Sequence, residues 1–373
     1  MPLRILMVLR APLGGLYRHV MDLTEALSVR GHQIGIIMDS ILSDAQTGER
    51  LRALSTPPVL GVHRMPISRL LGPHDISATR NIRKIADQHE VDVLHGHGAK
   101  GGFNARLARW GSKSRIAAYT PHGGVLNYER KSLIGKTLRT VEKIVLPLTD
   151  AMIFESDFVK QSFVEQIGPV PKLGPVILNG LDAAEFEPLD PASVEFDFAF
   201  VGELRAVKGL SHLLDALVDV KRPDGTPATL LIGGAGPEEG NIRAQMTKLG
   251  LDKRVTLAGV QPAREIFARA HFVVMPSLAE SLPYVALEAA AAQKPLIATD
   301  VGGVKEIFGP TASHLLPAAD VDALRKAMQD YVDNPASALS EMRQRLEWIK
   351  NNFSMDRMTD AIEDTYYQAL EQR

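Results

Sequence analysis

Short apolar runs alternate with stretches of helical periodicity along most of the chain. RILMVL (4–9) and QIGIIM (33–38) have the composition of buried strands, and residues 15–30 between them have the spacing of a helix. Strands and helices in this alternation form parallel sheets that helices cover on both faces. The pattern therefore predicts an α/β chain built from doubly wound sheets.

The predicted strands fall into two sets, and 373 residues exceed one typical domain. The first set continues at 91–95, 115–120 and 151–156, and the second comprises 196–202, 229–234, 254–259, 271–276 and 295–300. The proline-rich stretch from Pro171 to Pro191 marks the expected boundary. Loops at the carboxyl ends of each set predict a ligand cleft between two domains. We expect domains at 1–175 and 176–353, followed by a helix at 354–373.

Composition narrows the environment in which the chain works. No apolar run approaches the roughly 20 residues of a membrane span. Arg4 and Arg10 interrupt an N-terminal apolar stretch that is too short for a signal peptide. The absence of cysteine excludes disulfides and thiol chemistry. We therefore expect a cytoplasmic protein.

Charge is distributed unevenly along the chain. Residues 1–175 carry 23 basic and 15 acidic side chains, whereas the remainder carries 19 basic and 29 acidic ones. Such asymmetry indicates that the first half meets an anionic partner, such as phosphates or a membrane surface; ordinary surface variation is the alternative. We expect no nucleic-acid partner.

The segment ESLPYVALE (280–288) carries the strongest chemical signal. Glu280 follows a predicted strand, and Glu288 falls within the first turns of a helix expected to begin around Leu282. A carboxylate so placed accepts two hydrogen bonds from a vicinal diol such as that of ribose. The adjacent helix N-terminus offers free backbone N–H groups to a diphosphate.

Residues 276–307 resemble the donor-site signature of family 4 glycosyltransferases. The resemblance implies the GT-B fold, in which two Rossmann-like domains face a central cleft and the last helix crosses back to the N-terminal domain. It also implies that Glu280 faces the donor sugar, that Glu288 holds the ribose, and that Ser281 and Leu282 adjoin the donor. A solvated helix face with a chance pair of glutamates is the alternative.

Two further segments are similar to this family. VILNGLDAAEFEP (176–188) matches its interdomain segment, and FVGELRAVKG (200–209) matches a strand, turn and helix near the donor diphosphate, with Gly202 at the turn. Lys208 lies where the family has a diphosphate-binding lysine. Glu203, however, occupies the family's arginine position. Either Arg205 has taken over the phosphate contact, or Lys208 works with less help.

Other glycines complete the expected donor site. The resemblance places Gly14 and Gly15 near the donor phosphates, although such a pair alone is nonspecific. Gly234 lies in a tight turn after a strand, close to the nucleotide. Gly259 and Gln261 are expected to meet the base, largely through the backbone.

Histidines dominate the expected catalytic and acceptor residues of the first domain. His122, in TPHGG, matches the family's histidine that points at the reacting sugar. His95 and His97 resemble its H-x-H segment; histidines at this spacing also ligate metals, but no third ligand is evident. We expect the acceptor to contact His97 and a basic group of residues, namely Lys100, Arg130 and Lys131.

No metal site is expected for catalysis. Asp320 and Asp322 form the D-x-D string typical of metal-dependent glycosyltransferases, but they open a predicted helix, where an N-cap explains them better. Lys208, Arg205 and helix N-termini must then stabilise the departing diphosphate. The resemblance implies no cofactor beyond a substrate nucleotide-sugar linked to GDP or UDP.

The segment 128–147 predicts a basic amphipathic helix. It can lie on anionic lipid or can be a domain helix with a solvated face. We expect peripheral membrane contact, because the family often uses lipid-linked acceptors.

The resemblance implies a retaining, metal-independent glycosyltransferase that moves a hexose to a lipid-linked, polysaccharide or lipopolysaccharide acceptor. No side chain is evident as a nucleophile, so same-face attack is expected. Two alternatives stay open: a non-catalytic nucleotide-sugar-binding scaffold of a polysaccharide assembly complex, and a nucleotide-sugar 2-epimerase. No motif matches the pyridoxal phosphate lysine of phosphorylases.

Overall fold

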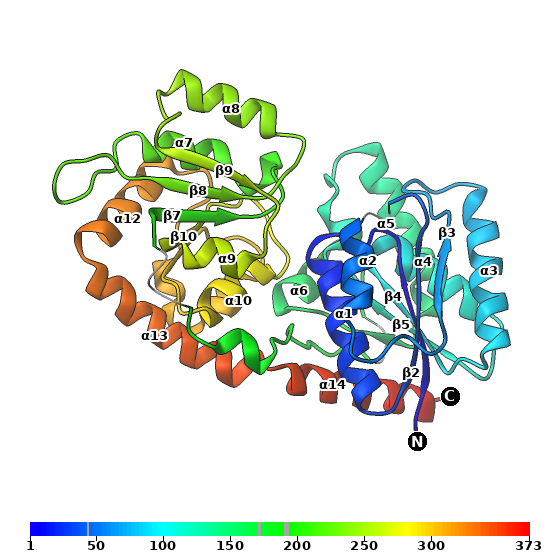
Figure 1. The fold of residues 1–373 in the computed structure, drawn as a ribbon. Helices are drawn as coiled ribbons and strands as arrows, with labels where there is room; N and C mark the ends of the chain where they lie inside the picture. The colour runs from blue at the N-terminus through cyan, green and yellow to red at the C-terminus, as the bar shows by residue number, and fades with distance from the viewer. Residues whose placement is uncertain (43–44, 171–172, 190–193) are drawn as a thin grey trace. The chain divides into compact units, whose positions relative to one another are not determined.

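The chain divides into two compact units in a computed structural model that describes residues 1–42, 45–170, 173–189 and 194–373 (Figure 1). The first unit comprises Met1–Gly180 and Met355–Arg373, and the second comprises Leu181–Ser354. The division thus falls slightly later than the expected boundary after residue 175. Pro171 and Pro191, which bracket that expected boundary, lie outside the described residues.

The first unit is built on a parallel six-stranded sheet with the order β3-β2-β1-β4-β5-β6. Its strands are β1 (Arg4–Leu9), β2 (Gln33–Asp39), β3 (Val62–Met65), β4 (Val93–His97), β5 (Ile116–Thr120) and β6 (Ala151–Met152). Its helices are α1 (Gly14–Val29), α2 (Ala45–Arg52), α3 (His74–Gln88), α4 (Gly98–Arg109), α5 (Leu133–Val145), α6 (Asp157–Gln166) and α14 (Met355–Glu371). A short 3-10 helix, η1 (Gly124–Asn127), follows β5.

The second unit has a parallel five-stranded sheet with the order β11-β10-β7-β8-β9. Its strands are β7 (Phe196–Val201), β8 (Leu230–Gly233), β9 (Val255–Gly259), β10 (Ala270–Met275) and β11 (Leu296–Ala298). Its helices are α7 (Leu210–Leu217), α8 (Glu239–Lys248), α9 (Ala263–Ala268), α10 (Tyr284–Ala291), α11 (Val304–Phe308), α12 (Val321–Asp333) and α13 (Pro335–Asn352). The 3-10 helix η5 (Ala206–Lys208) follows β7.

Burial explains which strands the sequence predicts well. β1 is buried from Ile5 to Leu9, because helices cover both faces of the sheet. β3 is an edge strand in which only Met65 is buried, so it lacks the apolar run that marks the others. The predicted strand at 151–156 is shorter than expected: β6 ends at Met152, and Phe154 continues only through an isolated bridge to Val176.

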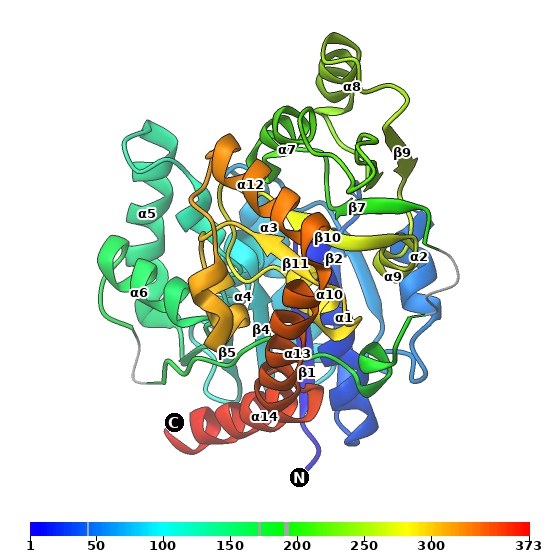
Figure 2. The same ribbon diagram turned by 90° about the vertical axis from the view of Figure 1, so that its left-hand side faces the viewer.

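The terminal helix α14 belongs to the first unit. It packs against α1, β5 and β6, and it is drawn in red at the C-terminus (Figure 2). Its buried face comprises Met355, Met358, Ile362, Tyr366 and Ala369. The helical spacing predicted for this segment is therefore confirmed, and its apolar stripe completes the core beside β1 and β2.

A buried ion pair fixes α5 against α4. Arg106 is fully buried, and its two terminal nitrogens donate to the Glu142 carboxylate at 2.5 and 3.0 Å. The guanidinium also lies over the ring of Tyr119, 4.2 Å from its centroid. A buried charge pair of this kind orients two elements strongly, because breaking it would leave one charge unpaired in the core.

Among the described residues, no helix combines the length and the apolar character needed to cross a membrane.

Candidate functional site

Lys208 and Glu280 meet at the carboxyl ends of the strands of the second unit. The Lys208 Nζ donates to Glu280 Oε1 at 2.7 Å, and the Ser277 hydroxyl donates to the same oxygen at 2.6 Å. η5 positions the lysine after β7, and the loop after β10 positions the glutamate. Residues 72 positions apart in the sequence thus form one partly buried, charge-assisted pair.

Glycines allow the loops around this pair to pack closely. A Cβ at Gly209, the residue after Lys208, would lie 1.9 Å from the Pro276 carbonyl oxygen. A Cβ at Gly302 would lie 1.9 Å from the Glu280 carbonyl oxygen, and Gly302 has a φ of +59°. Only glycine tolerates both the backbone angle and the contact, so these glycines fix the backbone on either side of the pair.

Helix α10 follows directly and carries Glu288. It begins at Tyr284, later than the expected start at Leu282, because Pro283 disfavours helical geometry at the residue before it. Leu282 is buried, whereas Ser281 and Glu288 are half-buried. The Ser281 carbonyl accepts from the Gly303 N–H at 2.6 Å, which ties the loop before α10 to the loop after β11.

The remaining predicted donor residues line the same edge of the sheet. Gly202 directly follows β7 and donates to the Gly233 carbonyl, while Gly234 donates to that of Gly259. Gln261 is exposed, and its amide donates to the Ala258 carbonyl at 3.2 Å. The structure therefore brings the expected turn residues of β7, β8 and β9 together.

Arg205 is solvent-exposed beside Glu203. Its guanidinium lies 3.6 Å from the Glu203 carboxylate, and more than half of each side chain is exposed. Such an exposed ion pair contributes little to the stability of the fold, so the Arg205 guanidinium can leave Glu203 and bind a phosphate. The structure is consistent with either sequence-based alternative for this arginine.

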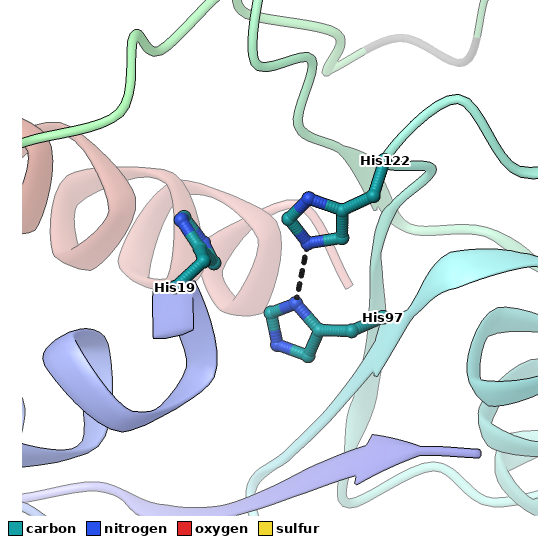
Figure 3. A group of neighbouring side chains, drawn as sticks. All are labelled: His19, His97 and His122. Carbon is teal, nitrogen blue, oxygen red and sulfur yellow. Dashed lines mark hydrogen bonds between the residues drawn. The ribbon is translucent and has the colours of Figure 1, made fainter. Parts of the chain in front are cut away.

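His95 and His97 of β4 gather with His122, after β5, and His19, on α1, in the first unit; Figure 3 shows His19, His97 and His122. His97 Nδ1 lies 3.2 Å from His122 Nε2, and His19 approaches both rings. His95 contacts the Tyr366 hydroxyl at 2.6 Å and the Thr120 hydroxyl at 2.9 Å. His122 has a φ of +48°, a conformation that is costly for a residue with a side chain. This backbone directs its ring toward His97.

Burial keeps these imidazoles neutral. Burial lowers the pKa of His19 to about 4, although a side-chain hydrogen bond with Asn179 opposes the shift. Burial, followed by the neighbouring imidazoles, lowers the pKa of His95, His97 and His122 well below its ordinary value. Each ring therefore offers one N–H donor and one nitrogen lone pair near neutral pH.

The expected acceptor residues have different surroundings. Lys100 is buried and forms an ion pair with Asp75, and it also donates to the Leu70 carbonyl. Its charge is thus engaged inside the first unit, and the acceptor contact predicted for it stays a prediction. Arg130 and Lys131 are exposed before α5. His97 lies in the histidine group described above.

The sequence does not predict a cavity of about 390 Å³ that lies at the ends of β1, β2 and β3. Its polar lining includes Arg10, Asp39, Arg69 and His74. Only the position of the cavity in the fold points to it, because ligands of open parallel sheets bind at the carboxyl ends of the strands. β3 itself was not predicted, so this part of the edge was not visible in the sequence.

Gly14 and Gly15 open α1, as expected. Gly14 has a φ of +60°, and no atom would touch a Cβ there.

Asp320 caps α12 by accepting from the Ala323 N–H at 2.9 Å, and Asp322 pairs with Arg325. The N-cap interpretation of the D-x-D string is confirmed.

Two parallel doubly wound sheets, with the lysine, two glutamates and glycine turns of the second unit, define a GT-B glycosyltransferase. The family model for glycosyl transferases group 1 matches residues 183–353, and that for glycosyltransferase family 4 matches residues 13–185. The two matches are contiguous and together span nearly the whole chain. The chain therefore belongs to the family 4 type of glycosyltransferases, and the expected fold class is confirmed.

Individual relatives agree with this assignment. The chain is 28% identical to the glycogen synthase of Mycobacterium tuberculosis, over 96% of this chain and 92% of that protein. It is 24% identical to the phosphatidylinositol N-acetylglucosaminyltransferase gpi3 subunit of Schizosaccharomyces pombe, over 94% and 78%. The fold is similar to that of the Anabaena HepE protein in complex with UDP-glucose, with a TM-score of 0.80, 19% identity and coverage of 98% and 100%.

Proposed function

We propose that this enzyme is a retaining, metal-independent hexosyltransferase that uses a UDP- or GDP-linked sugar and no other cofactor. The observation that carries the proposal is the Lys208–Glu280 pair, next to the helix that holds Glu288. A donor would bind with its diphosphate at Lys208, its sugar at Glu280 and its ribose diol at Glu288. The UDP-glucose complex of the structurally similar Anabaena protein supports a donor of this class.

The proposed reaction forms a bond between an acceptor oxygen and the anomeric carbon as the bond from that carbon to the donor phosphate oxygen breaks. The acceptor proton passes to the departing phosphate on the same face of the sugar. Lys208 and Arg205 would stabilise the negative charge that develops on the diphosphate. His122 would hydrogen-bond to the sugar near the reacting carbon.

We assign the acceptor to a lipid-linked, polysaccharide or lipopolysaccharide saccharide. The Schizosaccharomyces pombe relative is named for transfer to phosphatidylinositol, which supports an acceptor on a lipid. The cavity beside β1, β2 and β3 is lined by two arginines, Arg10 and Arg69, as well as by Asp39, and the arginines suit a saccharide that carries a phosphate. We propose that, with a lipid-linked acceptor, the enzyme works at the inner face of a membrane.

An acceptor-dependent transfer assay tests the reaction. We expect one nucleotide-sugar to yield a glycosylated lipid-linked or polysaccharide acceptor in the presence of EDTA, with the donor's anomeric configuration kept in the product NMR spectrum. Inverted product overturns retention, and loss of transfer on chelation overturns metal independence. Nucleotide-sugar epimerised without acceptor supports the 2-epimerase. Nucleotide binding without turnover supports the scaffold.

Helix α5 supports membrane contact through an unusual orientation. It buries two charged residues, Arg139 and Glu142. Its exposed apolar residues are Leu133, Ile134 and Ile144, which are 82%, 54% and 69% exposed. The ion pair with Arg106 turns the charged residues inward and leaves part of the apolar side of the helix exposed.

Exposed basic residues surround this apolar surface. They are Arg130, Lys131, Lys136 and Lys143. Apolar side chains that enter the headgroup boundary, together with cations that attract anionic headgroups, form an interfacial membrane anchor. We therefore propose that residues 128–147 lie on an anionic lipid surface.

Vesicle flotation tests this surface. We expect the wild type to float with vesicles that contain phosphatidylglycerol. The Leu133→Ser/Ile134→Ser variant should bind these vesicles at least about tenfold more weakly, because it loses apolar area that the membrane would bury. Ile76→Ser, which removes another exposed apolar residue of the first unit, is the matched control and should bind normally. Equal binding of the double variant and the wild type would contradict the proposal.

A further inference from the structure

Three imidazoles of the first unit come from three separate elements and face one another (Figure 3). His19 lies on α1, His97 ends β4 and His122 follows β5. One nitrogen from each ring lies within 4.8 Å of the others, and His97 Nδ1 and His122 Nε2 are only 3.2 Å apart. The sequence shows a pair of histidines at 95 and 97, but the trio uses only one of them.

The spacing is close to that of a metal site. Imidazole nitrogens bind Zn²⁺ at about 2.0–2.1 Å, so two ligands of one tetrahedral ion lie about 3.4 Å apart. The His97–His122 pair already has this separation. A small inward shift of His19 would complete a three-histidine site with a fourth position open, the arrangement found where zinc keeps a water or substrate ligand.

The surroundings of the rings also favour a metal. His97 is 1% exposed, so its ring lies away from bulk water. Asn179 forms a side-chain hydrogen bond with His19, and an outer partner of this kind orients a ligating histidine. The rings are packed where the neutral, ligating form of imidazole is favoured. No acidic side chain takes part in the trio.

We propose that His19, His97 and His122 bind one divalent transition-metal ion of the zinc type, and that this ion inhibits sugar transfer. Imidazole suits Zn²⁺ and its neighbours, whereas Mg²⁺ and Ca²⁺ prefer oxygen ligands. Inhibition follows because the metal would hold the His122 ring, which the proposed function places against the sugar. The inhibitory effect rests on the proposed function, whereas metal binding itself does not.

Cobalt binding tests the site without any assay of transfer. Co²⁺ added to the metal-free protein should give the visible absorption band of a cobalt ion with nitrogen ligands, and Zn²⁺ should displace it. His19→Gln and His97→Gln should each weaken Co²⁺ binding by about tenfold or more, which is the scale of loss when even an outer partner of a metal ligand is removed. His74→Ala, which removes an exposed histidine of the same unit, should bind Co²⁺ like the wild type.

Circular dichroism of each variant establishes that it is folded. Absence of the cobalt band, or a band that both glutamine variants retain in full, overturns the proposal. In the transfer assay, Zn²⁺ should abolish activity, EDTA should restore it, and His19→Gln should make the enzyme less sensitive. If Co²⁺ binds at these residues and Zn²⁺ leaves transfer unchanged, the metal site stands, and both the inhibition and the role proposed for His122 are wrong.

Discussion

Lys208→Ala should lower the turnover number for sugar transfer by about 10²–10³-fold, the usual cost of removing one group that stabilises charge in a transition state. Lys208 is the cation that we expect to lie nearest the diphosphate. The 3-10 helix η5 and the close-packed Gly209 hold this lysine in place. Its Nζ lies 2.7 Å from Glu280, so the two side chains are already positioned before a donor binds. Because the lysine acts on a charge that grows as the bond breaks, turnover should fall more than donor affinity.

Steady-state kinetics with the preferred donor measures this effect. Lys305→Ala is the matched control, since Lys305 is also in the second unit and forms an exposed ion pair with Asp300. That variant should keep nearly full turnover, because surface pairs contribute little. Undiminished turnover in a folded Lys208→Ala enzyme would show that another group stabilises the departing diphosphate, and Arg205 would then be the first candidate.

Glu288→Ala should weaken nucleotide binding by about 10- to 100-fold. A hydrogen bond that involves a charged partner is worth about 1.5–3 kcal/mol, so the net loss of one such bond to the ribose gives an effect of this size. Helix α10 holds Glu288 rigidly, with its neighbours Leu287 and Ala289 fully buried. The loss should therefore reflect the missing carboxylate and not a displaced helix.

Calorimetric titration with the nucleoside diphosphate measures this loss. Glu239→Ala, a half-buried glutamate in the first turn of α8, is the matched control and should bind as the wild type does. A thermal unfolding curve for each variant establishes that it is folded. An unchanged dissociation constant in Glu288→Ala would remove this residue from the donor site, whatever its place in the motif.

The architecture was largely predictable, because buried strands and amphipathic helices leave local patterns. The run from Ile5 to Leu9 is apolar since both faces of the sheet are covered. β3 was missed because an edge strand needs no continuous apolar run, as Val62 and Arg64 are exposed. The start of α10 was two residues off because Pro283 sets it.

The site was predictable only where a motif is local. Glu280 and Glu288 lie in one short segment, whereas the contact from Lys208 to Glu280 joins residues far apart. His19 gave no signal, because a histidine within a helix meets β4 and β5 only after the unit folds. The sequence also gives no sign that Lys100 is buried, because its partner Asp75 lies on another helix and takes the lysine out of solvent.

Titration of the wild-type chain with UDP, GDP and ADP in the presence of EDTA tests whether the second unit binds the nucleotide of a sugar donor. We expect one of these nucleotides to bind selectively and to stabilise the protein against thermal unfolding. A folded protein that binds none of the three would show that the second unit is not a nucleotide site.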